Sequence, residues 1–272
     1  MVKTKPSGVL AAAGGALVAV GSLMVMLMVV EARPAEATFP GPNGKIAYSV
    51  LNSGIYTINP GGGGKSKVTD TLMSGDAKPS YSPNGKRIAY SDYDGNDFEI
   101  YTINVGGGGK TQVTNNNTHD FWPAYSPDGK RIAYSGLDPV GGDYEIYTIN
   151  VDGGDEFRLT YNDISDDFEP DYSPDGKRIA YSGYEGPDTE IYTIKVGGGG
   201  ETKVTNNVKD EEAPSYSPDG EKIAYECFKA LGTDDDEDFD IEICTINVGG
   251  GGKTKVTDTV GYAMDPSWGR RP

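Results

Sequence analysis

The sequence predicts an all-β protein, a β-propeller built from four-stranded antiparallel blades. Three observations predict it. A block of four short β-prone segments recurs along the chain at intervals in the forties. Turn-forming residues separate these segments, with 39 Gly and 17 Pro in 272 residues. Almost no long stretch carries an apolar pattern of helical period. Five blocks can be found, so five blades are expected, and six would require a block that the sequence does not contain.

Each block contains four elements in fixed order, and each element is interpreted as one strand. The first ends in Pro-Asp-Gly or Pro-Asn-Gly, a tight turn in which Pro presets φ and Gly allows positive φ. The second reads "RIAYS" or "KIAYE", the third is typified by "IYTIN", and the fourth is a short Val-Thr or Leu-Thr end. Pro83, Pro127, Pro174 and Pro218 mark the first turn of successive blocks, 44, 47 and 44 residues apart.

The chain enters the repeat at a second strand and leaves it at a first strand. Residues 39–49, "FPGPNGKIAYS", begin with the second element, whereas "PSWG" at 266–269 matches the start of the first. The C-terminal strand is therefore expected to pair into the first blade. That pairing would close the ring and leave no sheet edge exposed.

The stretch "INVGGGGKTQVT" at 103–114 looks like a phosphate loop, because its glycines run into Lys110 and Thr111. The phosphate motif requires another glycine at the position of Asn104 and a helix after the lysine, whereas the residues that follow here are β-prone. Similar stretches occur at 58–69, 149–160, 194–205 and 246–257. The repetition predicts a hairpin turn between third and fourth strands.

Residues 1–37 are predicted to be a signal peptide or membrane anchor, and residues 38–272 a single propeller domain. Lys3 and Lys5 precede a mostly apolar run over 9–30, and Ala35 and Ala37 form the small-x-small pattern that signal peptidase cuts. Cleavage after Ala37 is favoured, and an uncleaved anchor is the alternative, because the run could also span a bilayer. Both interpretations predict an exported protein that is periplasmic, extracellular or on the cell surface.

The chain is strongly acidic, with a formal net charge of −17, and residues 1–37 contribute +1 to it. Such a charge repels nucleic acid and anionic lipid, so no nucleic-acid partner is expected, and membrane contact only through an uncleaved N-terminal segment. The charge suits cations, basic proteins or simply solubility. Cys227 and Cys244 fall in neighbouring strands of one block; export permits a disulfide between them, but the sequence leaves the pairing open.

The repeats resemble the TolB-like, WD-repeat-like propeller family, whose blades carry an SPDG turn, an "IAY" strand and an "EIY" strand. The matching stretches are "YSPDGKRIAYSG" at 125–136 and 172–183, followed by "YEIYTINV" at 144–151 and "TEIYTIKV" at 189–196. The resemblance covers 39–269 and implies the propeller fold. TolB itself has an α/β domain before six blades and works in envelope integrity in the periplasm. The N-terminal segment here is too short for that domain, so the fold carries over and the TolB role does not.

One acidic position recurs three residues before the first-strand prolines. It is occupied by Asp76, Asp120, Asp167 and Glu211, with Ala263 in the last block. Because first strands line the channel of a propeller, these carboxylates are expected to ring its mouth, with the single histidine, His119, beside them. Such a ring would attract a cation or a basic partner. The alternative is that each carboxylate hydrogen-bonds within its own turn and serves the fold.

The loops between second and third strands add acidic groups to the same face, and the opposite face is mildly basic. The loop "DYDGND" offers Asp92, Asp94 and Asp97 as a candidate calcium site, because Ca²⁺ takes six to eight oxygens from such loops. It lacks the distal Glu of the twelve-residue calcium loop, and no other cofactor is expected. The insertion at 228–240 is the main asymmetry of the repeat and the predicted partner contact.

The sequence therefore predicts a monomeric, exported, non-enzymatic scaffold that binds a protein or basic peptide through its acidic face. The alternatives are a propeller enzyme acting on carbohydrate or peptide and a propeller stabilised by Ca²⁺. No catalytic residue is assigned, because no nucleophile motif supports one and the acids repeat from blade to blade, whereas catalytic residues break symmetry.

Overall fold

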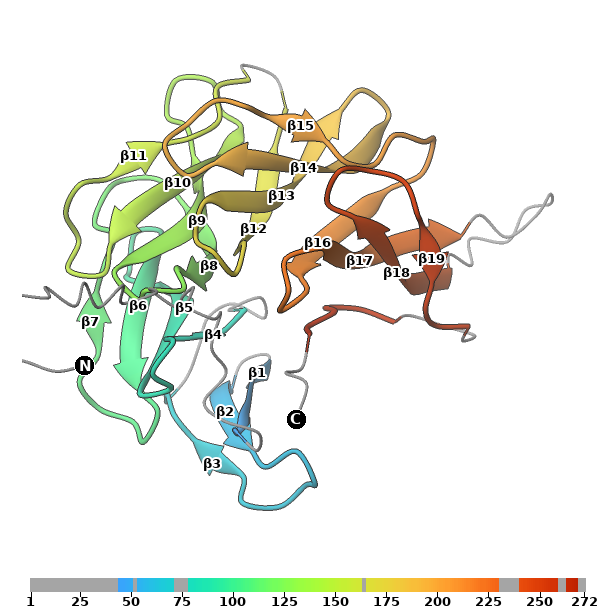
Figure 1. Cartoon of the computed structure of the whole chain (residues 1–272). Helices are drawn as coiled ribbons and strands as arrows, with labels where there is room; N and C mark the ends of the chain where they lie inside the picture. The colour runs from blue at the N-terminus through green and yellow to red at the C-terminus, as the bar shows by residue number, and fades with distance from the viewer. Residues whose placement is uncertain are drawn as a thin grey trace, which may run out of the picture. The chain divides into compact units, whose positions relative to one another are not determined.

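The computed structural model describes residues 44–50, 53–70, 78–162, 165–229, 240–258 and 263–268. All of them belong to one compact unit, Arg33–Pro272. Over these residues the chain forms 19 strands in five antiparallel sheets. Figure 1 shows the sheets following one another around a centre, with β4, β8, β12 and β16 innermost. The predicted all-β, five-bladed propeller is confirmed. The described residues contain no helix that could cross a bilayer.

Each sheet is one sequence block, and neighbouring strands in the sheet are neighbours in the chain. The described part of the first blade is β1 (Ile46–Val50), β2 (Gly54–Ile58) and β3 (Ser66–Lys67). The second is β4 (Ser80–Tyr81), β5 (Arg87–Tyr93), β6 (Phe98–Asn104) and β7 (Thr111–Gln112). The third is β8 (Asp120–Tyr125), β9 (Arg131–Leu137), β10 (Tyr144–Asn150) and β11 (Phe157–Arg158). The fourth is β12 (Asp167–Tyr172), β13 (Arg178–Glu185), β14 (Asp188–Lys195) and β15 (Thr202–Lys203). The fifth is β16 (Glu211–Tyr216), β17 (Lys222–Lys229), β18 (Asp240–Asn247) and β19 (Thr254–Lys255).

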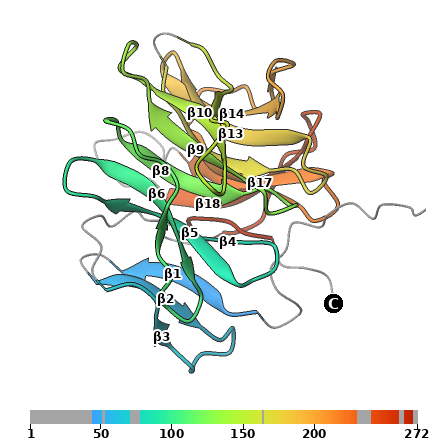
Figure 2. The same ribbon diagram turned by 90° about the vertical axis from the view of Figure 1, so that its left-hand side faces the viewer.

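The hydrophobic core lies between adjacent blades. Ile88 and Tyr90 of β5 share one cluster with Ile55 and Val68 of the first blade, and Figure 2 shows these two sheets next to each other. Because the middle strands are covered on both faces, the "RIAYS" segments are buried almost throughout, and their tyrosines, such as Tyr134, are at most 1% exposed. Blade-on-blade burial therefore explains why this segment is the most regular part of the repeat.

The tetraglycine stretch is a hairpin turn, as predicted. Strand β6 pairs with β7 through Tyr101↔Gln112 and Thr102↔Thr111, and the turn between them places three glycines at positive φ, including Gly109 at 61°. Lys110, which resembles a phosphate-loop lysine, instead donates to Asp92 at 2.7 Å and lies 3.9 Å from the centroid of the Tyr101 ring. This contact occupies its ammonium group within the blade.

The residue before each first-strand proline has a positive φ. These residues are Lys78, Trp122, Glu169, Ala213 and Asp265, with φ of 28°, 54°, 58°, 52° and 53°. In β8, β12 and β16 the register with the next strand shifts at this point, as in a β-bulge. The bulge separates the two ends of each first strand and changes which side chains face the centre.

The C-terminal segment 263–268 has the same conformation and contacts the fifth blade. The Ala263 amide donates to the Ile241 carbonyl at 2.8 Å, and the Asp265 amide donates to Glu226 Oε1 at 2.6 Å. One blade earlier, the amide of Ala213 donates to Ser182 Oγ at 3.1 Å, at the equivalent place. The segment thus contacts the fifth blade much as the first strand of the fifth blade contacts the fourth. Its ladder to β1 is not among the strand pairs of the described residues and stays a prediction.

Cys227 of β17 and Cys244 of β18 form a disulfide, with their Cα atoms 5.8 Å apart. Cys227 lies opposite Glu242 in the ladder, so the bridge runs diagonally to Cys244 two residues further along β18. The structure thereby settles the pairing that the sequence left open.

Candidate binding site at the channel mouth

A hollow of about 400 Å³ lies where the first strands converge at the centre of the ring. Its walls come from the second to fifth blades and from the C-terminal segment. The lining residues are Lys78, Trp122, Tyr144, Asp166, Phe168, Glu169, Glu212, Glu226, Met264 and Asp265. Four of the five residues that precede a first-strand proline are among them. We call this hollow the channel mouth.

Lys78 connects three segments across the channel mouth. Its Nζ pairs with the carboxylate of Glu169 and lies 3.1 Å from Asp265 Oδ1. Burial alone would lower the pKa of Lys78, but the two carboxylates outweigh burial and raise the pKa, so the side chain stays cationic. Glu169 also accepts the amide of Ala213 at 2.8 Å. These contacts fix the positions of the charged groups around the hollow.

Glu212 and Glu226 form an acidic wall of the hollow. The two residues lie opposite each other in the β16–β17 ladder. Burial, reinforced by Glu169, Glu226 and Asp210, raises the pKa of Glu212 to about 7. Burial also raises the pKa of Glu226. Glu226 occupies the place of the serine that ends "RIAYS" in the preceding blades, so this carboxylate breaks the repeat. The charge of the channel mouth therefore changes near neutral pH.

Aromatic rings form the other wall and continue away from it. Trp122 lies 5.8 Å from Phe168, 6.2 Å from Tyr144 and 5.5 Å from Phe121, measured between ring centroids. His119 stacks on Phe121, and its Nδ1 accepts the amide of Phe98 at 3.2 Å. We call this set the aromatic belt, consisting of Phe98, His119, Phe121, Trp122, Tyr144 and Phe168. All six side chains are half-buried, so the belt presents apolar surface beside an acidic wall.

The repeated acids are not where the sequence analysis placed them. Asp120, Asp167 and Glu211 are at most 1% exposed and do not line the channel mouth, which corrects the expected ring of carboxylates. Asp120 accepts from Asn116 Nδ2 at 2.9 Å, and Glu211 accepts from Asn207 Nδ2 at 2.6 Å. These contacts match the alternative that the acids serve the fold, although the partners are asparagine side chains. Asp76 lies outside the described residues.

Burial explains how such acids are tolerated. It raises the pKa of Asp120 to about 8, and the neighbouring Glu99 raises it further against hydrogen bonds that lower it. It likewise raises the pKa of Asp167 to about 8, with Glu145 contributing in the same direction. Asp120 and Asp167 are therefore largely protonated at neutral pH, so neither adds a second negative charge beside Glu99 or Glu145. Glu211 is instead paired with Lys253 at 2.7 Å.

The position that supplies four of the residues lining the channel mouth lies two residues further along each first strand. The residue before the proline is Lys, Trp, Glu, Ala or Asp in successive blocks, whereas the acidic position is nearly constant. The signal was present in the sequence, since variation at a fixed place in a repeat marks a position that the blade itself does not need.

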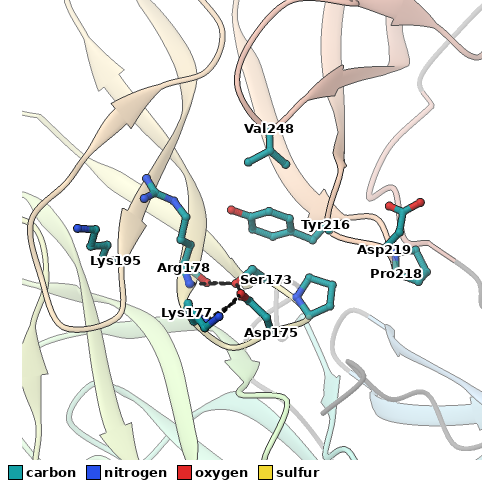
Figure 3. A pocket seen from close by; sticks show the side chains of 11 residues that line it. Ser173, Asp175, Lys177, Arg178, Lys195, Tyr216, Pro218, Asp219 and Val248 are labelled. Atoms are coloured by element: carbon teal, nitrogen blue, oxygen red, sulfur yellow. Dashed lines mark hydrogen bonds and ion pairs between the residues drawn. The ribbon is translucent and has the colours of Figure 1, made fainter. Parts of the chain in front are cut away.

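A second hollow, of about 680 Å³, lies between the fourth and fifth blades on the side of the Pro-Asp-Gly turns (Figure 3). Its polar groups are engaged within the turns, because Ser173 Oγ donates to Asp175 Oδ1 at 2.8 Å and accepts the Arg178 amide at 2.9 Å. The same contacts recur at Ser126, Asp128 and Arg131 of the third blade. We attribute this hollow to the repeat.

The candidate calcium residues are only partly brought together. Asp94 and Asp97 lie close to each other, but the third carboxylate beside them is Glu99. Asp92 is instead bound by Lys110. Of the 228–240 insertion, residues 230–239 lie outside the described part of the chain.

Comparison with known proteins places the fold. No protein-family profile and no curated protein matches the chain. Among solved structures, a protein assigned as TolB from Agrobacterium tumefaciens superposes with a TM-score of 0.71 at 27% identity, covering 86% of this chain and 85% of that one. TolB from Acinetobacter baumannii gives 0.65 at 23% identity, covering 84% of this chain and 56% of that one.

The same fold also occurs in an enzyme. An oligogalacturonate lyase in complex with manganese gives a TM-score of 0.55 at 15% identity, covering 81% of this chain and 65% of that one. A likeness at this identity shows the fold alone, so the fold does not by itself assign a reaction. The sequence motifs, the five blades and the structural neighbours agree: the chain folds as a β-propeller similar to those of TolB-like proteins.

Proposed function

We propose that the chain is a non-enzymatic binding scaffold whose channel mouth takes a basic peptide segment of a protein partner. The observation that carries the proposal is the balance of charge around the hollow. Five carboxylates line it, whereas the single lining cation, Lys78, is already paired with two of them. The volume lies within the ~300–1,000 Å³ typical of ligand sites.

The two walls suit a lysine or arginine side chain. Such a side chain has an apolar stem and a charged end, and it can lay the stem against Trp122 and Phe168 while the charge meets Glu212 and Glu226. The aromatic belt would then receive apolar residues that flank the basic one. Salt should weaken this binding, because the Debye length is only about 8 Å at physiological ionic strength.

The test is titration with a tryptophan-free peptide, acetyl-Leu-Lys-Phe-Lys-Leu-amide, followed by fluorescence and by calorimetry. Trp122 is one of only two tryptophans and lies in the site, so its emission should change on binding. The double variant Glu212→Gln, Glu226→Gln should bind at least tenfold more weakly. The control Lys177→Ala, on the opposite face, should bind like the wild type. Equal binding of a matched peptide with Glu in place of Lys would refute the proposal.

We also propose that the protein acts outside the cytoplasm. The Cys227–Cys244 disulfide supports this, because such bonds persist in oxidising compartments. The signal-like pattern of residues 1–37 supports it independently, although that segment lies outside the described residues. Cell fractionation, with mass spectrometry of the mature N-terminus, should find the protein in the envelope or medium. Recovery only from the cytoplasm with both thiols reduced would exclude export.

A further inference from the structure

A buried glutamate lies near the start of the third strand in four blades, and in three of them it faces a basic residue from the fourth strand. Arg158 pairs with Glu145, Lys203 lies 3.6 Å from Glu190, and Lys255 lies 3.9 Å from Glu242. The equivalent pair in the second blade is Glu99 and Gln112. The second blade thus keeps the buried acid and replaces its cation with a neutral amide.

The third blade shows how the cation is held. Arg158 Nη1 donates to Asp138 Oδ2 at 2.8 Å, and Nη2 pairs with Glu145. The loop there is closed by a backbone hydrogen bond of 2.8 Å from Asp138 to Asp143. A guanidinium group therefore joins the carboxylates of Asp138 and Glu145, whereas both carboxylate oxygens of Asp143 are buried without a hydrogen-bond partner among the described residues.

The second blade presents the matching acids. Asp94 and Asp97 close its loop through the same backbone hydrogen bond, at 3.0 Å, and correspond to Asp138 and Asp143. One carboxylate oxygen each from Asp94, Asp97 and Glu99 can lie within 4.8 Å of the others. Among the described residues no arginine pairs with them, and Lys110 pairs with Asp92 instead, at 2.7 Å.

Two further observations concern the carboxylates of Asp97 and Asp94. Asp97 is only 3% exposed; its Oδ2 accepts from Asn96 Nδ2 at 2.9 Å, and its Oδ1 is buried with no hydrogen-bond donor among the described residues. A buried carboxylate oxygen without a partner is costly unless a cation meets it. Asp94 accepts the amides of Asn96 and Asp97 at 2.7 and 3.1 Å. These hydrogen bonds lower its pKa and fix its carboxylate as an anion.

We propose that the second blade binds calcium through Asp94, Asp97 and Glu99, in place of the guanidinium that fills the equivalent position in the third blade. The ligands are all oxygens, which a hard cation prefers, and a spread of 4.8 Å is about twice the ~2.4 Å Ca–O distance. Backbone carbonyls of the loop and water would complete the coordination. Mg²⁺ fits less well, because it demands a tighter octahedron at about 2.1 Å.

Calcium at this place would also stabilise one end of the aromatic belt. Asp97 and Glu99 flank Phe98, and the Phe98 amide donates to His119. A cation that fixes the loop therefore fixes the ring against which His119 and Phe121 pack.

The test compares the two blades directly, with CaCl2 added to protein treated with EDTA. For the wild type, calorimetry should show one site, and the melting temperature should rise by about 5 °C at a hundredfold excess over Kd. Gln112→Arg supplies the cation of the third blade, so it should raise the melting temperature without calcium and abolish the response to it. Asp97→Asn should also abolish the response, whereas the matched variant Asp143→Asn should retain it.

Gln112→Arg still tests the calcium site if Asp97→Asn fails to fold. Absence of binding to folded wild type up to 10 mM CaCl2, or an unchanged calcium response in Gln112→Arg, would overturn the site. An equal response to MgCl2 would overturn the choice of calcium. The complementary variant Arg158→Gln should create a second calcium response in the third blade.

Discussion

Two positions in the first strands lie only two residues apart, yet one is buried within the blades and the other lines the channel mouth. The first, at Asp120, Asp167 and Glu211, is acidic and buried in the third, fourth and fifth blades. The second, immediately before the proline, differs in every block, and four of its five residues line the channel mouth. In a repeat protein, a side chain that every blade keeps is one that every blade needs for folding. A variable side chain on a constant backbone is free to specialise.

The contacts of the constant position show why each blade needs it. In the second blade, Thr114 Oγ1 donates to Glu99 while accepting the amide of Ile100 at 2.8 Å. The same hydrogen bond from a third-strand amide to a threonine recurs at Thr160, Thr205 and Thr257. Asp120 joins this network at Glu99. The repeated acids therefore belong to a polar network that aligns the third and fourth strands with the next first strand.

The largest expected effect comes from removing the fifth copy of the variable position. Deleting residues 263–272 removes the hydrogen bonds of Ala263 and Asp265 to the fifth blade and that of Trp268 Nε1 to the Ser215 carbonyl at 3.0 Å. We expect a loss of about 3–5 kcal/mol from the roughly 5–15 kcal/mol of a typical domain, seen in urea denaturation, together with aggregation. A truncated chain that melts like the wild type would show that this segment does not close the ring.

The second prediction concerns pH and the constant position. The pKa of Asp120 and that of Asp167 are about 8 in the folded state, above the ~3.9 of an unfolded Asp. Their contribution to stability is therefore fully present below about pH 4 and is lost as pH rises towards 8. We expect the melting temperature to fall between pH 5 and pH 8.

Asp120→Asn imitates the protonated acid and provides the control. It should stabilise the protein at pH 8, by on the order of 1–3 kcal/mol, and change little at pH 5. Asp120→Ala should destabilise at both pH values, because Asn116 loses its partner. Parallel pH profiles for wild type and Asp120→Asn would mean that Asp120 is ionised in the folded state.

The comparison also shows how far the sequence could predict the molecule. The blades, the turns and the hairpin at Gly109 were predictable, because each local signal occurs about five times and all copies agree. The residues of the site were not predictable, because the strict alternation of side chains along a strand would put Asp120 and Trp122 on the same face. The register shift between Phe121 and Ala124, with positive φ at Trp122, separates them. Only the backbone of the bulge decides which of the two faces the channel.

The third prediction concerns Lys78 and should affect binding more than folding. Lys78→Met keeps much of the apolar stem and removes the cation from between Glu169 and Asp265. The channel mouth then gains one net negative charge, so the basic peptide should bind about 3–10-fold tighter at low salt. Calorimetry at 50 and 300 mM NaCl measures this gain, which salt should diminish. Weaker binding would show instead that Lys78 positions Glu169 for the ligand.

The smallest expected effect is the pH dependence of peptide binding that arises from Glu212. The pKa of Glu212 is about 7, so this side chain is mostly neutral at pH 6 and mostly charged at pH 8. A basic peptide should therefore bind a few-fold more tightly at pH 8 than at pH 6. Glu212→Gln should remove most of this difference and match the weaker, low-pH affinity of the wild type throughout. In the wild type, Lys177 Nζ lies 3.3 Å from the exposed Asp175, on the opposite face. The control Lys177→Ala should therefore keep the wild-type pH profile. If Glu212→Gln keeps the full pH dependence, the titrating group is another acid of the channel mouth, and Glu226, the carboxylate that replaces a repeated serine, would be the residue to change next.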